Sequence, residues 1–283
     1  MREFLEILKA VFFGIVEGIT EWLPISSTGH MILFDEFIRL NVSSEFKELF
    51  LVVIQLGAIL AVPFLFAKKL FPFTKDLDRE ERSKIYSLWC KVALGVIPAA
   101  LLGFLLDDLL DKYLYNYVVV SVALIVYGIA FILIEHFKKD REYRIDSVYD
   151  ITYKDALKIG VYQALSLIPG TSRSGSTILG GMLSGVSRTA SAEFSFFMAI
   201  PIMLGASGLK VVKFILDGYT ATPLEILLLI TGVAVSFLVS MLAIRFLMDF
   251  VKKHDFKPFG IYRIALGIIV IIYFLIKSLN YNI

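Results

Sequence analysis

Long runs of apolar residues, separated by short polar segments, occupy most of the chain. A helix that crosses the hydrocarbon layer of a bilayer needs about 20 predominantly apolar residues, and six runs approach or exceed that length. They are Leu49–Ala67, Ile85–Leu106, Tyr117–Ile134, Phe194–Leu216, Leu224–Met248 and Ile261–Ile276. The pattern therefore predicts an all-α polytopic membrane protein with six transmembrane helices.

Composition supports a membrane protein and excludes other classes. Hydrophobic residues make up 58% of the 283 residues and the mean hydropathy is +0.77, which exceeds what a soluble core requires. The net charge is only +2 and the basic residues gather between the apolar runs, which argues against a nucleic-acid partner. Acidic residues interrupt the N-terminal segment, unlike the continuous apolar run of a cleavable signal peptide, so we expect it to remain in the mature protein. Cys90 is the single cysteine, which excludes an internal disulfide.

The sequence repeats itself at an interval of 146 residues. Residues 14–20 align with residues 160–166 without a gap, and Ser26–His30 aligns with Ser172–Ser176 in the same register. Pro24 and Pro169 fall one residue out of step. Weak internal symmetry of this kind is typical of duplicated membrane folds.

Each repeated segment resembles a membrane span that is interrupted halfway. In residues 4–39 the apolar pattern breaks between Pro24 and Gly29, and the remaining part contains Asp35 and is too short to cross. Because irregular backbone at membrane depth is tolerated only inside protein or a wet cavity, we interpret residues 4–39 and 155–186 as re-entrant helical hairpins.

One hairpin followed by three transmembrane helices makes a repeat, so the second copy enters the membrane from the opposite face. The expected organisation is an inverted repeat. The first repeat covers residues 1–137, a solvated linker covers residues 138–153, and the second repeat covers residues 154–283.

The distribution of basic residues in the loops predicts the orientation, because Lys and Arg are enriched in cytoplasmic loops. One set of loops is basic and the other holds only Lys112. The loops with few basic residues are expected outside, together with both termini. These loops are residues 40–46, 107–115 and 217–223. The rich set, expected in the cytoplasm, contains Lys68, Lys69, Lys75, Arg79, Arg82, Lys84, the linker residues Lys138, Lys139, Arg141 and Arg144, and Lys252, Lys253 and Lys257.

Glu17 and Glu21 are candidate metal ligands. They lie four residues apart on one face of a helix, where two like charges repel each other. Ionisable groups within a membrane segment are costly and usually mark a functional site. A divalent cation, Mg²⁺ or Ca²⁺, would suit carboxylate oxygens. A wet interfacial helix end or a proton relay is the alternative.

The two interrupted segments also carry candidate phosphate ligands. Ser26, Ser27 and Thr28 have the composition of a helix N-terminus, where free N–H groups attract anions. The second copy repeats the pattern with Thr171, Ser172, Ser174 and Ser176, and adds the donor fork of Arg173. If the two tips meet, they predict a phosphate or diphosphate pocket. Close helix packing through small residues is the alternative, but packing gives no reason for Arg173.

Other polar residues are further candidates. His30 ends the first motif and is a candidate for proton transfer, with a structural role as the alternative. Gln55, Gln163 and Thr177 are candidates to line the cavity, and for Gln55 a structural role is the favoured alternative. Arg188 and Glu193 are spaced like an intrahelical ion pair or rim residues and are interpreted as structural.

Two motifs resemble a known family. The sequence EGITEWLPISSTGH at Glu17–His30 and the sequence PGTSRSGSTI at Pro169–Ile178 are similar to the signature motifs of the bacterial undecaprenyl-diphosphate phosphatases, also called bacitracin-resistance proteins. The likeness extends to Ser184–Arg188, Glu193–Phe196 and Ile261–Arg263, and so to nearly the whole chain.

The resemblance implies an enzyme of the bacterial cytoplasmic membrane. Such an enzyme removes the terminal phosphate of undecaprenyl diphosphate and regenerates the monophosphate carrier for cell-wall synthesis. The family is metal-dependent and described as dimeric, so a divalent cation, a homodimer and surrounding lipids are the implied partners. The family's acidic pair matches Glu17 and Glu21, its Ser-Ser-Thr-Gly-His loop matches Ser26–His30, and its arginine loop matches Ser172, Arg173 and Ser174.

The chemistry predicted for such a site is phosphoryl transfer, which needs charge neutralisation and in-line positioning. We expect Ser27 to attack with His30 taking its proton, while His30 and a metal-bound water are alternative nucleophiles. Two other functions remain open. A secondary transporter or lipid flippase would share the inverted-repeat architecture, and a purely structural scaffold is disfavoured by the intramembrane charges.

Overall fold

The computed structural model describes residues 2–73, 77–114, 116–137 and 142–281, and its described part is built from helices. Lys75 and the linker residues Lys138, Lys139 and Arg141 lie outside this part. Six helices are long and apolar enough to cross a membrane. They are α3 (Ser44–Leu65), α5 (Arg79–Leu114), α6 (Tyr117–Phe137), α9 (Arg188–Leu216), α10 (Pro223–Val251) and α11 (Lys257–Tyr281). The predicted polytopic all-α class is confirmed.

Shorter helices occupy the two interrupted segments. Helices α1 (Arg2–Thr20) and α2 (Ser27–Phe37) form the first hairpin, and α7 (Tyr153–Ala164) and α8 (Arg173–Leu183) form the second. A short helix α4 (Ala67–Leu70) follows α3, and the 3₁₀ turns η1 (Val148–Asp150) and η2 (Leu165–Leu167) flank α7. We call residues 21–26 tip 1 and residues 165–172 tip 2.

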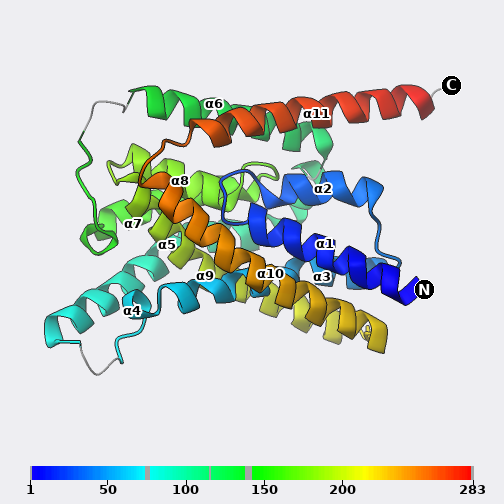
Figure 1. Cartoon of the computed structure of the whole chain (residues 1–283), viewed down its shortest axis with the longest axis horizontal. Helices are drawn as coiled ribbons and strands as arrows, with labels where there is room; N and C mark the ends of the chain where they lie inside the picture. The colour runs from blue at the N-terminus through cyan, green and yellow to red at the C-terminus, as the bar shows by residue number, and fades with distance from the viewer. Residues whose placement is uncertain (1, 74–76, 115, 138–141, 282–283) are drawn as a thin grey trace.

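Helices that are distant in sequence pack side by side. Helix α1 packs along α10, and α7 packs along α5, so each hairpin lies against a span of the other half of the chain. Helix α3 contacts both α9 and α10, while α6 and α11 form a pair at one side of the molecule (Figure 1). This arrangement brings the two hairpins together near the middle of the protein.

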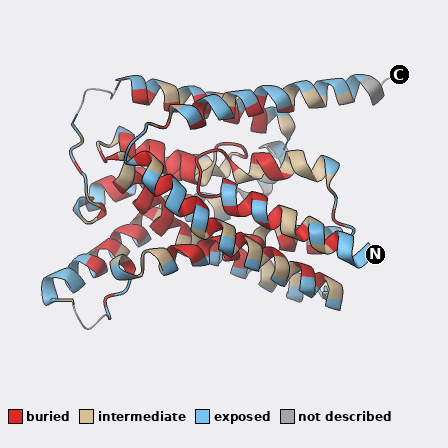
Figure 2. Ribbon diagram, in the orientation of Figure 1, coloured by how far each residue is buried: buried red, intermediate tan, exposed pale blue. Residues whose placement is uncertain are grey.

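The buried residues concentrate where the hairpins meet the surrounding spans, and the outward faces of the long helices are exposed (Figure 2). Many of these outward residues are large and apolar. Phe104 is 83% exposed, and Phe64 and Leu242 are also exposed. Such a surface would be costly in water and is typical of contact with lipid.

Two expectations from the sequence are wrong. Residues 107–114 continue helix α5 and do not form a loop, because the segment lacks Gly and Pro and nothing in it ends the helix. Arg188 and Glu193 do not form an intrahelical pair. Arg188 binds Glu135 of α6, and Glu193 binds Lys69 of α4. Each residue therefore links α9 to a different helix, because a spacing of five residues places the two side chains on different faces of α9.

Candidate active site

The two tips end in the same local structure. Ser26 caps α2 and Ser172 caps α8, and each hydroxyl accepts a hydrogen bond from the backbone N–H three residues later, at Gly29 and Gly175. Among the described residues that are not glycine, only these two have a positive φ, of 74° and 70°. Strained backbone of this kind clusters at functional sites. Helices α2 and α8 therefore begin at equivalent residues that share the same unusual backbone conformation.

The first turn of α8 contacts tip 1 directly. The hydroxyl of Ser174 donates to the backbone carbonyl of Glu21 at 3.0 Å, and it lies 3.4 Å from the carbonyl of Leu23. Arg263 of α11 joins the tips from a fully buried position. Its Nη1 donates to Pro24 O of tip 1, and its Nη2 donates to two carbonyls of tip 2, those of Gly170 and Thr171.

Arg173, the first residue of α8, reaches across to the first hairpin. Its Nη2 lies 2.8 Å from Glu21 Oε1, and its Nη1 donates to the carbonyl of Ser195 at 2.8 Å. Thr177 helps to fix both Arg173 and Ser195, because its hydroxyl bonds to the Arg173 carbonyl and to Ser195 Oγ. The guanidinium also lies over the Trp22 ring, 5.7 Å from its centroid. Arg173 Nε is buried without a partner, which leaves one donor unused.

Glu21 connects Arg173 to Ser27. Its second oxygen, Oε2, accepts a hydrogen bond of 2.7 Å from Ser27 Oγ. Ser27 is the first residue of α2, so its hydroxyl lies beside the free N–H groups of that helix end. A carboxylate that holds a serine hydroxyl and faces a guanidinium can accept the hydroxyl proton while the guanidinium binds an anion.

His30 is engaged away from Ser27. Its Nδ1 lies 2.7 Å from the carbonyl of Ser26 and its Nε2 lies 2.7 Å from the hydroxyl of Tyr262. Because a carbonyl can only accept, Nδ1 carries the proton and Nε2 accepts from Tyr262. The expected Ser27–His30 pair is therefore replaced by a Ser27–Glu21 pair. His30 instead holds the backbone of tip 1 at Ser26.

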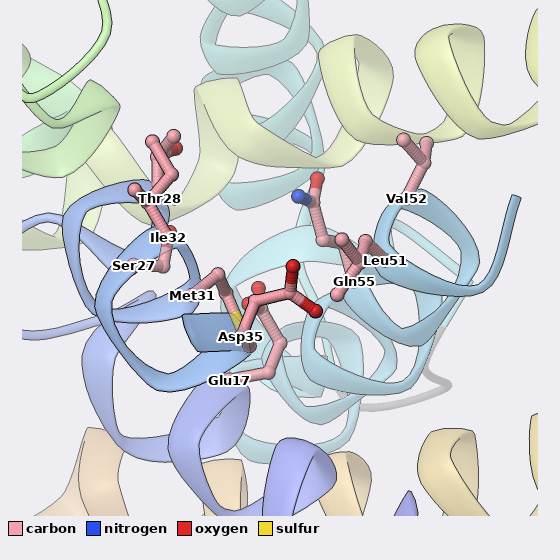
Figure 3. A pocket seen from close by; sticks show the side chains of 9 residues that line it. All are labelled: Glu17, Ser27, Thr28, Met31, Ile32, Asp35, Leu51, Val52 and Gln55. Atoms are coloured by element: carbon pink, nitrogen blue, oxygen red, sulfur yellow. The ribbon is translucent and has the colours of Figure 1, made fainter. Parts of the chain in front are cut away.

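Two adjoining cavities open beside these groups. One of about 180 Å³, the Arg173 lobe, is lined by Glu21, Ser27, Thr28, Gln55, Ser166, Pro169, Gly170, Ser172, Arg173, Ile202, Met203 and Ala206. The other, of about 260 Å³, is the Glu17 lobe, lined by Glu17, Ser27, Thr28, Met31, Ile32, Asp35, Leu51, Val52 and Gln55. Ser27, Thr28 and Gln55 border both lobes. Figure 3 shows the side chains around the Glu17 lobe, which come from α1, α2 and α3.

The two candidate metal ligands belong to different lobes. Glu17 is 1% exposed and its Oε1 has no hydrogen-bond partner, whereas both oxygens of Glu21 are bonded. Within the described residues, no three Asp, Glu, His or Cys side chains lie close enough together to hold a metal ion. A cation at Glu17 would therefore need neutral oxygen donors, water or substrate oxygens in addition.

The remaining candidates lie outside both lobes. Gln163, Ser176 and Thr177 are buried, and none of them lines either cavity. Gln163 occupies the position that corresponds to Glu17 in the repeat, and neither polar atom of its carboxamide has a partner. Ser174 holds the first turn of α8 against tip 1, and Ser26 caps α2. The first hairpin thus carries Glu17, Glu21 and the Ser27 hydroxyl, while the second supplies the guanidinium of Arg173.

Several residues of the site were missed by sequence reasoning. Arg263 carried a usable signal, because a charged residue near the start of an apolar span is rarely without a role. Asp35 is a further acidic residue in the first segment, and it lines the Glu17 lobe. Tyr262, Ser195 and Trp22 stand in segments that carry the family resemblance, but their contacts could not be predicted, because they join segments far apart in sequence.

Comparison with known proteins covers almost the whole chain. Residues 10–269 match the model of the family described as bacitracin resistance protein BacA. The chain belongs to this family. It is 57% identical over 272 residues to an undecaprenyl-diphosphatase of Enterococcus faecalis, covering 95% of this chain and 98% of that protein. Proteins of the same name from Acetivibrio thermocellus and Desulfitobacterium hafniense are each 54% identical, and the matches cover 96% and 97% of this chain and 98% of each of those proteins.

Proposed function

We infer that this protein is an integral membrane phosphatase that hydrolyses undecaprenyl diphosphate to undecaprenyl phosphate and inorganic phosphate. Its membership of the bacitracin resistance family and its identity above 50% to undecaprenyl-diphosphatases along nearly their whole length support this activity. The observation that carries the chemistry is the chain of contacts Ser27–Glu21–Arg173 at the border of a cavity between two helix N-termini.

The Arg173 lobe suits a diphosphate group. Arg173 has one unused buried donor, and a phosphate oxygen could also replace Glu21 at Nη2. Ser27 and Thr28 open α2, so their N–H groups and the positive end of the helix would favour an anion there. The apolar remainder of the substrate would leave toward lipid.

The contacts favour Ser27 as the nucleophile. Its oxygen would bond to the terminal phosphorus, its proton would pass to Glu21, and the bond from that phosphorus to the bridging oxygen would break. Undecaprenyl phosphate would leave with the bridging oxygen and both bonding electrons. Water would then attack the phosphorus of the phosphoserine and lose a proton to solvent, the bond from phosphorus to Ser27 Oγ would break, and Glu21 would return its proton to that oxygen as inorganic phosphate is released. Arg173 would stabilise the negative charge in both steps.

A divalent cation, Mg²⁺ or Ca²⁺, fits the residues present at Glu17. The buried Oε1 of Glu17 lacks a partner, and Ser27, Thr28 and Gln55 offer oxygens beside the same cavity. When bound, such a cation supplies charge neutralisation for the diphosphate. Glu21 is the weaker candidate ligand, because Arg173 and Ser27 already occupy its oxygens.

The orientation of the chain follows from its loop charges. We place both termini outside and residues 142–153 of the linker in the cytoplasm, with the first hairpin dipping into the membrane from outside and the second from the cytoplasm. Each hairpin packs against a span of the other half of the chain, which supports two halves that interlock with opposite orientations.

Phosphate release by the purified protein tests the activity. In detergent with Mg²⁺ or Ca²⁺, the protein should release inorganic phosphate from undecaprenyl diphosphate, and Glu21→Gln should lower turnover by at least a hundredfold because Ser27 loses its proton acceptor. A matched control is Glu225→Gln, which changes a buried capping carboxylate at the far end of α10. Absence of release, together with lipid translocation that survives Glu21→Gln, would favour a flippase and contradict the phosphatase.

A further inference from the structure

Gln55 faces the junction of the two lobes from the side opposite Ser27. Of the residues that border both lobes, Ser27 and Thr28 belong to α2 and Gln55 belongs to α3. Figure 3 shows Gln55 across the cavity from the first turn of α2, with its carboxamide directed into the space between the two helices. The residue is half-buried, and within the described part of the chain no group hydrogen-bonds to that carboxamide. Its donors and its acceptor are therefore free to bind a molecule in the cavity.

The backbone on both sides of Gln55 is held by neighbouring helices. Three residues earlier, the carbonyl of Val52 accepts a hydrogen bond of 3.1 Å from Ser207 Oγ of α9. Two residues later, Gly57 touches the backbone of α10 at Val233. Helix α3 therefore presents the Gln55 amide from a fixed position relative to the rest of the site, which is the property that a group orienting a reactant needs.

The use of Ser27 as nucleophile defines where the water of the second step must lie. In phosphoryl transfer the attacking and leaving oxygens lie roughly in line with the phosphorus. The bridging oxygen of the substrate must therefore leave on the side of the phosphorus opposite Ser27 Oγ, and the water must enter on that same side. Glu21 contacts Ser27 Oγ itself, so its carboxylate serves the serine oxygen and not the water.

The other polar side chains of the two lobes suit this position less well than Gln55. Ser172 already caps α8, and Ser166 borders only the Arg173 lobe. Glu17 borders only the Glu17 lobe, and its negative charge would be repelled by a phosphate. Thr28 follows Ser27 on the same helix. A neutral carboxamide can accept a hydrogen bond from water through its oxygen and donate one to a phosphate oxygen through its nitrogen.

We propose that Gln55 orients the water molecule that hydrolyses the phosphoserine formed at Ser27. The proposal rests on the proposed phosphatase function and deepens its second step. Gln55 Oε1 accepts a hydrogen bond from the water, and Gln55 Nε2 donates one to an oxygen of the phosphoserine. The water oxygen bonds to phosphorus and loses a proton to solvent, while the bond from phosphorus to Ser27 Oγ breaks. That oxygen keeps the electron pair and takes its proton back from Glu21. Gln55 itself neither gains nor loses a proton.

Rapid mixing of the full-length protein with undecaprenyl diphosphate, in detergent with Mg²⁺, separates the two steps. Formation of the phosphoserine releases undecaprenyl phosphate, whereas inorganic phosphate appears only in the second step. Gln55→Met keeps the length of the side chain and removes its hydrogen bonds. Phosphate release should slow by roughly tenfold to a hundredfold, because the water is no longer held in line. Undecaprenyl phosphate should appear as a burst at close to the wild-type rate, and intact-mass measurement should find a phosphate on Ser27.

Gln163→Met is the matched control. Gln163 is also a glutamine without hydrogen-bond partners, at the corresponding place in the second hairpin helix, but it lines neither lobe. This variant should keep the wild-type ratio of the two rates and accumulate no phosphoserine. Gln55→Asn keeps the carboxamide but withdraws it by one carbon, so it should accumulate phosphoserine to a smaller extent. It provides the test if Gln55→Met does not fold, and the amplitude of the burst counts the folded molecules in either variant.

The role of Gln55 and the phosphatase function can fail separately. Equal slowing of both steps in the Gln55 variants, with no phosphate on Ser27, would overturn the role of Gln55 while wild-type phosphate release upheld the function. A higher KM for the lipid with both rates unchanged would assign Gln55 to substrate binding and would also overturn its role. A wild-type protein that releases neither undecaprenyl phosphate nor inorganic phosphate would overturn the function, and the role of Gln55 with it.

Discussion

Arg173 is held by groups from two other elements, tip 1 and α9. Glu21 of tip 1 and Ser195 of α9 bind its Nη atoms, and Trp22 covers its face. A guanidinium fixed in this way needs little reorganisation when charge develops on a phosphoryl group, which is the condition for strong electrostatic stabilisation. Lysine lacks the planar fork and could not make the same contacts together.

Replacing Arg173 should therefore abolish most of the turnover. Arg173→Ala is expected to lower kcat for undecaprenyl diphosphate by at least a hundredfold, by analogy with arginines that stabilise phosphoryl transfer. Arg173→Lys should restore only part of the loss. Steady-state phosphate release measures both variants. The control is Arg245→Ala, on the exposed face of α10. Activity near the wild-type value in Arg173→Ala would remove the guanidinium from the reaction.

At the scale of elements, close helix packing sets the position of the first hairpin. Helix α10 supports both α1 and α3. At Gly57 of α3, an added Cβ would lie 2.1 Å from the carbonyl oxygen of Val233 in α10, closer than atoms can approach. Glycine thus allows the two backbones to touch, as is common between membrane helices. Gln55, which borders both lobes, is two residues before this contact.

Gly57→Ala should therefore destabilise the protein. The helices must separate at this contact, at a cost of roughly 1–3 kcal/mol, and a lower melting temperature in detergent would report it. Gly205→Ala in α9 is the control, because no heavy atom lies within 4 Å of the added Cβ. There the better helix propensity of alanine should leave stability unchanged or raise it by up to about 1 kcal/mol. Equal melting temperatures for the two variants would contradict the packing argument.

At the scale of the molecule, α11 holds the halves of the site together through two consecutive residues. Arg263 binds carbonyls of both tips, and Tyr262 binds His30 of α2. The guanidinium of Arg263 is fully buried, and the groups that accept its hydrogen bonds are backbone carbonyls. Its role is to position the tips, because it lines neither lobe.

Arg263→Met should leave three tip carbonyls without their donor. Each buried unpaired carbonyl costs about 1–3 kcal/mol, so the melting temperature should fall. In the folded fraction, the factor by which kcat falls should exceed the factor by which KM rises. The reason is that Glu21 and Arg173 would no longer be held in the correct position relative to each other. Arg263→Lys, which can bind fewer carbonyls, should be intermediate in both measurements. An unchanged melting temperature together with wild-type kcat would contradict this role.

Local signals in the sequence were sufficient for the class of the protein and for the start of each site helix. The six apolar runs predicted the six long helices, because a bilayer requires a fixed length of apolar helix. The Ser-rich segments predicted helices that start near Ser26 and Ser172. This worked because an N-cap depends only on a side chain and a backbone N–H group three residues later. The end of α5 was missed, since polar residues do not by themselves stop a helix.

Which side chains touch was decided by the tertiary structure alone. Glu21 and Arg173 are 152 residues apart, and His30 and Tyr262 are 232 apart, so no local pattern links either pair. The sequence favoured His30 as the partner of Ser27 because the two are neighbours in the motif, but the turn of α2 directs them to different partners. By itself the sequence determined the apolar spans, the starts of the two site helices and the residues available for chemistry. Only the packing of the two hairpins against distant spans, which selects one set of contacts among many, decided how those residues divide into an anion side and an acidic side.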